Sequence, residues 1–253
     1  MCRHLAYVGE PVSLASLLTE PRFSLYRQSW APRHQEHGVL NADGFGIGWY
    51  VEGLAEPARH RGAGPIWADE TVTDLARVIR SNAVLAAVRS ATVGMAHGPA
   101  AAAPFRSGKW LFSHNGAVAG WPATASGLAW GLDPGALAQL EAPTDSALLW
   151  AMIRDLLARG KPPEAALAEV VSRTVALGGG RLTMLLTDGH AIAAVAWGTS
   201  LYWRNLPGGV VVASEPYDDE LGWVAVPDGS LLVADRHVVN VEPLDLGRPT
   251  ATT

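Results

Sequence analysis

The residue best suited to chemistry is Cys2, the one cysteine in this sequence of 253 residues. Removal of Met1 would make Cys2 the N-terminal residue, with a free α-amine whose ordinary pKa is about 8. That amine could accept the thiol proton, directly or through a water, and leave a thiolate nucleophile. Alternatively, Cys2 is only a small apolar residue of a first strand. The other polar motifs decide between these two interpretations.

Three further sites could bind and polarise an amino-acid amide. Arg89 follows the apolar run 84–88, and an arginine there needs an anion, either an internal carboxylate or that of a substrate. Asn115 and Gly116 could direct a side-chain amide and a backbone N–H at one oxygen, as an oxyanion hole requires. The same pair, between two strand-like runs, is also typical of a β-hairpin turn. Asp145 falls in the first turn of an expected helix, where it suits the helix dipole or could hold an ammonium group.

The composition favours a globular protein with a small-molecule substrate. Apolar residues make up 49% of the chain and charged residues 17%, with a net charge of −5 and no run of lysine or arginine. These values argue against nucleic acid or an anionic membrane as a partner. A single cysteine excludes an internal disulfide and fits a reducing compartment, and no apolar signal-peptide run opens the chain. We therefore expect a cytoplasmic protein.

Two patterns that could indicate a bound cofactor or metal are rejected. The glycines at 44, 46 and 48 do not have nucleotide-loop spacing, and a strand rather than a helix follows them. Glycines at alternate positions instead leave one face of a strand without side chains, so that a backbone or a ligand can approach it closely. His34 and His37 lack a third ligand nearby. We expect no cofactor and no metal.

The periodicity of apolar residues places these motifs on an α+β framework. Helical spacing predicts helices at 73–81, with Asn82 as the stop, and at 163–177. It predicts a third helix that Thr144 caps and Gly160 ends, and Ser13 could cap a short helix. Short apolar runs bounded by turns predict strands at 5–8, 84–88, 182–186, 192–197, 201–203, 210–213, 223–226, 231–234 and 238–241. Strands at both ends with helices between them, and no β–α–β alternation, favour a layered domain over 2–246. Residues 247–253 are expected to be a tail.

The order of the motifs resembles one known family. Met1-Cys-Arg, Asn41-Ala-Asp-Gly-Phe-Gly-Ile-Gly-Trp-Tyr, Val88-Arg-Ser-Ala-Thr, Phe112-Ser-His-Asn-Gly and Thr144-Asp-Ser follow each other as in the class II glutamine amidotransferases. These are N-terminal-nucleophile hydrolases, so the resemblance implies an αββα four-layer sandwich. Within the family, the chain is most similar to the amidohydrolases of ergothioneine biosynthesis. That subgroup hydrolyses the γ-glutamyl amide of γ-glutamyl-hercynylcysteine sulfoxide.

The resemblance also implies a role for each residue. Cys2 is the nucleophile that forms a glutamyl thioester, with its own α-amine as base. Asn115 and Gly116 form the oxyanion hole. Arg89, with help from Thr92, binds the α-carboxylate of the γ-glutamyl group. Asp145 binds its α-ammonium.

Other functions stay open at this stage. The chain could be a glutaminase subunit that supplies ammonia to a separate synthase, or a non-enzymatic domain. Ser90 and Val93 replace an aromatic residue and a histidine that such glutaminases often carry beside the arginine, which favours a leaving group bulkier than ammonia. If that group carries a trimethylammonium, an aromatic face could hold it. Trp30, Trp49 and Trp121 are candidates.

Overall fold

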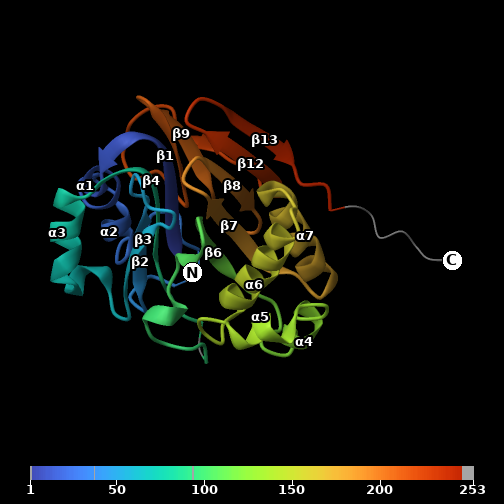
Figure 1. Ribbon diagram of the computed structural model, residues 1–253. Coiled ribbons are helices and arrows are strands. Elements are labelled where there is room, and N and C mark those ends of the chain that lie inside the picture. Colours follow the sequence, from blue (N-terminus) through green and yellow to red (C-terminus); the bar gives the residue numbers. More distant parts are fainter. Residues whose placement is uncertain (1, 37, 93, 247–253) are drawn as a thin grey trace.

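The computed structural model describes residues 2–36, 38–92 and 94–246. The expected removal of Met1 and the expected tail 247–253 concern residues outside these ranges, as do His37 and Val93. Within them, two antiparallel sheets stack face to face, and helices cover the outer face of each sheet (Figure 1). The expected αββα four-layer sandwich is therefore confirmed.

The first sheet carries the start of the chain at its centre. Strand β1 pairs with β4 on one side and β10 on the other, both antiparallel. The seven strands lie in the order β11 (Val224–Ala225), β9 (Tyr202–Leu206), β10 (Gly209–Ala213), β1 (Arg3–Ser13), β4 (Arg80–Val88), β2 (Phe45–Trp49), β3 (Ala58–Gly62).

The second sheet packs on the first through small and branched apolar side chains, among them Ala6, Val8, Leu185 and Ala194. Its six strands lie in the order β13 (Val239–Pro243), β12 (Ser230–Asp235), β8 (Ala191–Ala196), β7 (Gly180–Thr187), β6 (Trp110–Val118), β5 (Phe105–Ser107).

The helices form the two outer layers. The first sheet is covered by α1 (Leu14–Leu18), α2 (Leu25–Gln28) and α3 (Glu70–Val78). The second is covered mainly by α6 (Asp145–Ala158) and α7 (Pro163–Ala176), with the short α4 (Ala125–Leu128) and α5 (Pro134–Ala138) beside them (Figure 1). Two 3₁₀ turns lie at Ile66–Ala68 and Pro99–Ala101. No helix in the described part of the chain has the length and apolar character needed to cross a membrane.

The alternation of β1 determines which way its first residues face. Leu5 and Tyr7 pack under the helices α1–α3, whereas Ala6 and Val8 pack between the sheets. Because side chains alternate along a strand, His4 also faces the second sheet, where its Nδ1 lies 3.0 Å from the hydroxyl of Ser113. The end of β1 next to Cys2 is thus directed at β6.

Most expected elements are present, with corrected ends. Ser13 caps α1 and Thr144 caps α6, each through its hydroxyl, as predicted. The helix expected at 73–81 runs instead from Glu70, capped by Asp69, to Val78. Asn82 does not end that helix but lies inside β4, because β4 begins at Arg80 to pair with the end of β1. Strand β1 itself continues past Gly9 and Pro11 through an irregularity in its pairing.

Candidate active site

The thiol of Cys2 lies at the end of the sheet sandwich, partly exposed. Its Sγ is 3.8 Å from the carbonyl oxygen of Ser90, which follows β4. A small cavity of about 20 Å³ adjoins it, lined by Arg89, His114 and Ser146 among others. The antiparallel pairing of β1 with β4, with Arg3 opposite Val88, accounts for this meeting of Cys2 and Arg89.

Arg89 is 8% exposed and is held by carbonyl oxygens. Its Nη1 donates to Asp43 at 3.2 Å and its Nη2 to Ala96 at 3.0 Å. Both acceptors are neutral backbone carbonyl oxygens, and Arg89 has no carboxylate partner within the described ranges. A buried guanidinium has five N–H donors and favours bidentate carboxylates. The alternative that an internal Asp or Glu pairs with Arg89 is therefore wrong for the described residues. The guanidinium can still bind the carboxylate of a substrate.

Asp145 begins α6, as expected, and is 4% exposed. Its carboxylate accepts hydrogen bonds from the backbone N–H of Val118 at 3.0 Å and of Ser146 at 2.7 Å. These bonds tie the start of the helix to the end of β6. The helix dipole favours negative charge at this place, and the two carboxylate oxygens can accept further bonds. An ammonium group could be one further donor.

Asn115 and Gly116 do not form a hairpin turn. Both lie inside β6, opposite Thr183 and Leu182 of β7, so the hairpin alternative is wrong. At Gly116 a Cβ atom would collide with the backbone carbonyl of Arg181. This close approach of β6 and β7 explains why residue 116 is a glycine. The neighbouring Asn115 is fully buried.

Thr92 lies on the wall of a second, larger cavity of about 720 Å³. Ala96 and Val118 lie on the same wall. Since Arg89 contacts Ala96 and Asp145 contacts Val118, this cavity, hereafter the Thr92 cavity, adjoins both expected clamp residues. Of the three substrate-binding candidates, Thr92 alone lines it, while Arg89 and Asp145 each contact one residue of its wall.

The three tryptophan candidates lie in different places. Trp121 lines the Thr92 cavity and packs against the core under α6 and α7. Trp30 instead contacts Trp67 edge-on at 5.6 Å between ring centroids, and Trp49 packs against the core on the other side of the first sheet. Only Trp121, of these three, is at the candidate site.

A buried polar cluster between the sheets was missed by the sequence analysis. Burial, reinforced by the positive charge of Arg3, lowers the pKa of His4 to about 3. The backbone N–H of His4 donates to the hydroxyl of Ser214 at 3.0 Å, and one end of the Asn115 side-chain amide lies 3.4 Å from the same hydroxyl. The period-two pattern after Cys2 could have placed His4 on the inner face, but nothing local indicates Ser214.

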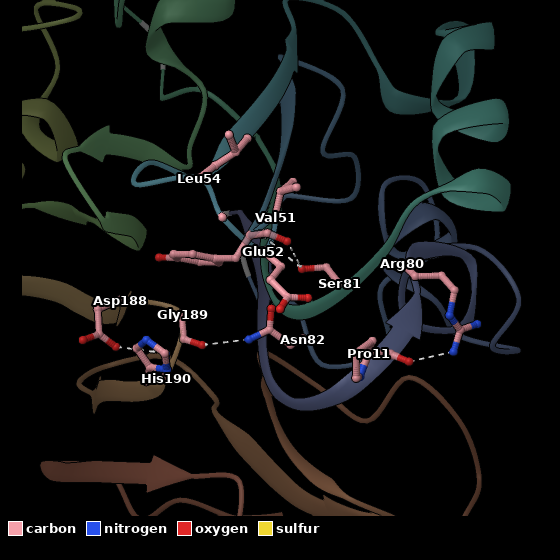
Figure 2. A pocket seen from close by; sticks show the side chains of 12 residues that line it. Pro11, Val51, Glu52, Leu54, Arg80, Ser81, Asn82, Asp188, Gly189 and His190 are labelled. Carbon is pink, nitrogen blue, oxygen red and sulfur yellow. Dashed lines mark hydrogen bonds between the residues drawn. The ribbon is translucent and has the colours of Figure 1, made fainter.

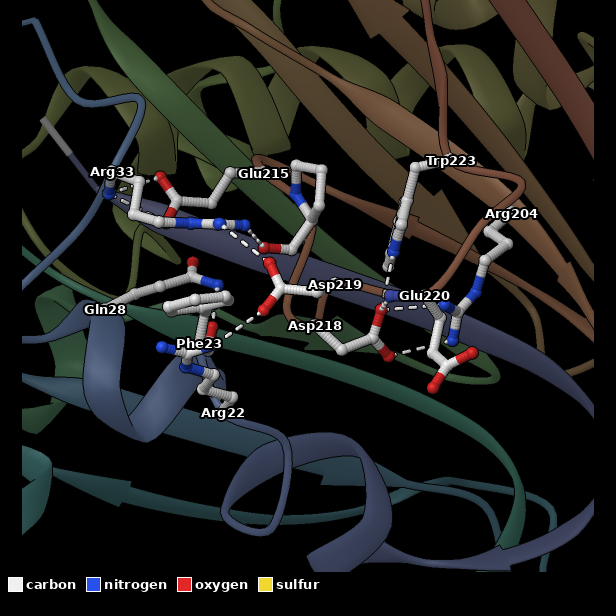
Figure 3. A network of polar contacts seen from close by, with 11 residues as sticks. Arg22, Phe23, Gln28, Arg33, Arg204, Glu215, Asp218, Asp219, Glu220 and Trp223 are labelled. Carbon is white, nitrogen blue, oxygen red and sulfur yellow. Dashed lines mark hydrogen bonds and ion pairs between the residues drawn. The ribbon is translucent and has the colours of Figure 1, made fainter.

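A second feature that the sequence did not reveal anchors the backbone at Arg33 and His34. The carboxylate of Glu215, fully buried, accepts the backbone N–H of Arg33 at 2.9 Å (Figure 3). It also accepts the backbone N–H of His34 at 2.8 Å. The Arg33 side chain donates to the carbonyl of Pro216. Burial lowers the pKa of Arg3, and the negative charge of Glu215 opposes that shift. Glu215 therefore supplies hydrogen-bond acceptors to Arg33 and His34 and a compensating charge to Arg3, the residue after Cys2.

Another cavity, of about 590 Å³, lies away from this chemistry (Figure 2). Pro11 and Arg80 line it, and both belong to the ends of β1 and β4 opposite Cys2 and Arg89. Its arginine and asparagine side chains are engaged with backbone carbonyls. Within the described ranges, no three histidine, cysteine or acidic side chains gather as metal ligands in either region.

This chain is similar in sequence and in fold to known proteins. Residues 13–207 match the family of class II glutamine amidotransferases. The chain is 44% identical to the gamma-glutamyl-hercynylcysteine sulfoxide hydrolase of Mycolicibacterium smegmatis, over 96% of this chain and 100% of that protein. It is 41% identical to the protein of the same name from Mycobacterium tuberculosis (strain CDC 1551 / Oshkosh), over 97% of each. A solved structure of a glutamine aminotransferase class-II domain protein from Silicibacter pomeroyi superposes with a TM-score of 0.70 at 24% identity, over 96% of this chain and 99% of that one. The last similarity shows the fold alone.

Proposed function

Because this chain belongs to the class II glutamine amidotransferases, we propose that it hydrolyses the γ-glutamyl amide bond of γ-glutamyl-hercynylcysteine sulfoxide. The products are hercynylcysteine sulfoxide and glutamate. Two relatives bearing the name of this hydrolase align over nearly their whole length with this chain. Those relatives favour a hydrolase over the alternative of a glutaminase subunit that feeds ammonia to a synthase.

The observation that carries the proposal is the convergence of a thiol, a cation and an anion. Cys2 and Arg89 line one cavity, and Asp145 directly precedes Ser146 on the wall of that cavity. A γ-glutamyl group carries an α-carboxylate and an α-ammonium close to the scissile carbonyl. Arg89, with Thr92, would hold the carboxylate, and Asp145 would hold the ammonium, which leaves the γ-carbonyl at Cys2.

The reaction proceeds in two steps once Met1 is removed. The free α-amine of Cys2 takes the thiol proton, and the thiolate attacks the γ-carbonyl carbon. The electron pair of the carbonyl moves to its oxygen, which Asn115 and the N–H of Gly116 stabilise. One such donor lowers a barrier by about 3–4 kcal/mol. Collapse breaks the C–N bond, and the Cys2 ammonium protonates the leaving nitrogen.

The second step releases glutamate. Water attacks the glutamyl thioester while the α-amine of Cys2 accepts a proton from it, and the sulfur leaves as the thiol. No step requires a cofactor, because nucleophile, base and acid belong to one residue. A thiol that must stay reduced supports a cytoplasmic location, and residues 2–246 would act as one catalytic domain.

A panel of γ-glutamyl compounds tests the proposal. Purified protein is given the sulfoxide substrate, γ-glutamylcysteine and free glutamine at equal concentrations, and released glutamate is measured. The proposal expects the highest kcat/KM for the sulfoxide substrate. A preference for glutamine, with ammonia release raised by a synthase, would instead identify a glutaminase subunit. No turnover of any γ-glutamyl amide would overturn both.

A further inference from the structure

The side-chain amide of Asn115 is fully buried at the junction of the two sheets. One end of it lies 3.4 Å from the hydroxyl of Ser214 and 3.4 Å from the hydroxyl of Thr199. The other end is buried with no hydrogen-bond partner in the described part of the chain. A buried polar atom without a partner costs about 1–3 kcal/mol, so this vacant end calls for an explanation.

The hydroxyl protons decide which end of the amide faces Ser214. The Ser214 hydroxyl already accepts the backbone N–H of His4 at 3.0 Å. If Nδ2 of Asn115 faced both hydroxyls, neither hydroxyl proton would have an acceptor among the described contacts, and Oδ1 would be vacant as well. The two ends of a carboxamide have the same shape, so hydrogen bonding assigns them. If Oδ1 faces the hydroxyls, it accepts the hydroxyl protons of both Ser214 and Thr199. The end of the amide without a partner is then the Nδ2 group, which is a hydrogen-bond donor.

We infer that Ser214 and Thr199 are positioning residues, which donate their hydroxyl protons to Oδ1 of Asn115 and thereby aim Nδ2 at the developing oxyanion. The inference rests on the proposed function, in which Asn115 is an oxyanion donor. A donor held in place before the reaction costs no reorganisation during it. The vacant N–H gains its partner only when the carbonyl oxygen of the substrate becomes negatively charged.

Ser214 also sets this donor in register with the nucleophile. It follows β10, and its backbone N–H donates to the carbonyl of His4 at 2.9 Å while its hydroxyl accepts the N–H of His4. His4 is two residues from Cys2 on β1, whereas Asn115 belongs to β6 of the other sheet. The Ser214 side chain thus links β1, which begins directly after Cys2, to β6, which bears the oxyanion donor.

A double-mutant cycle tests the inference. Thr199→Val and Ser214→Ala each remove one hydroxyl, and each is expected to lower kcat about tenfold, as the loss of one such hydrogen bond implies, while KM changes less than about twofold. In an Asn115→Ala background neither substitution should lower kcat further, because the group they position is absent. Thr199→Ser, which retains the hydroxyl, should restore kcat, and Ser172→Ala on α7 is the matched control.

Alkylation of Cys2 by iodoacetamide separates positioning from general disruption. This reaction uses the thiolate but develops no oxyanion, so its rate and pH profile should not change in Thr199→Val. Equal losses in alkylation and hydrolysis, additive effects with Asn115→Ala, or full kcat in Thr199→Val would each overturn the inference. If Ser214→Ala fails to fold, the Thr199 series carries the whole test. Absence of γ-glutamyl hydrolysis in the unsubstituted protein would refute the proposed function instead.

Discussion

Arg89 donates a hydrogen bond from Nη2 to the carbonyl oxygen of Ala96 at 3.0 Å, so the guanidinium is fixed without being neutralised. If it binds the α-carboxylate, Arg89→Ala should lower kcat/KM for γ-glutamyl substrates by about a hundredfold, the upper end for losing a charged hydrogen bond. A 4-aminobutanoyl amide lacks that carboxylate and should lose much less. Equal losses for both substrates would remove Arg89 from substrate binding. The exposed Arg77→Ala serves as control.

Asp145 offers the complementary experiment. Asp145→Asn removes the negative charge that would hold the α-ammonium, so kcat/KM for a γ-glutamyl amide should fall about tenfold or more. A glutaryl amide has no ammonium and should be affected less. Because Asp145 also accepts the N–H of Val118 and Ser146, thermal unfolding is measured alongside. A penalty that is the same for both amides would assign Asp145 a purely structural role.

The stability of the protein should depend on His4 at acid pH. Burial, together with the charges of Arg3 and His114, lowers its pKa from 6.5 to about 3. Between these values the unfolded chain binds a proton that the folded chain does not. The free energy of unfolding therefore falls as the pH drops from 6.5 toward 3, by up to about 1.4 kcal/mol per pH unit, and this loss is absent above 6.5.

Urea unfolding at several pH values measures this contribution. In this pH window, His4→Asn should reduce by up to one the number of protons taken up on unfolding, so the slope should flatten. Ser172→Ala, which removes no titratable group, should leave the slope unchanged. An unchanged slope in His4→Asn would show that His4 titrates alike in the folded and unfolded chain.

The fully buried Glu215 should stabilise the segment of Arg33 and His34, in which the next residue, Gln35, accepts a hydrogen bond from Arg3. Glu215→Ala leaves the N–H groups of Arg33 and His34 without their acceptor, and the expected loss is about 2–3 kcal/mol in the free energy of unfolding. Faster amide hydrogen exchange over residues 31–36 would accompany it. The exposed Glu220→Ala, whose side chain is also drawn in Figure 3, should have neither effect. Unchanged exchange in Glu215→Ala would contradict the anchoring role.

The layers and the candidate residues were accessible from the sequence because their signals are local or ordered along the chain. Apolar periodicity gave α6, α7 and most strands, and the order of short motifs indicated the family. The cap of α6 by Thr144 followed from residue type alone. The sequence also singled out Cys2, Arg89 and Asp145, which the fold brings to one end of the sandwich.

The remaining features depend on pairing between distant segments. Asn115-Gly116 has the residues of a turn, yet β7 pairs with it across a long stretch of chain, and the paired partner overrides the local preference. His4 and Ser214 are 210 residues apart. No local pattern indicates that a serine after β10 contacts both His4 on β1 and Asn115 on β6.

Intact-mass spectrometry of protein quenched during turnover tests the central claim most directly. The account predicts a chain without Met1, part of it heavier by one glutamyl group, and neither adduct nor turnover in Cys2→Ala. A fully active protein that retains Met1, or a glutamyl adduct that persists in Cys2→Ala, would contradict it.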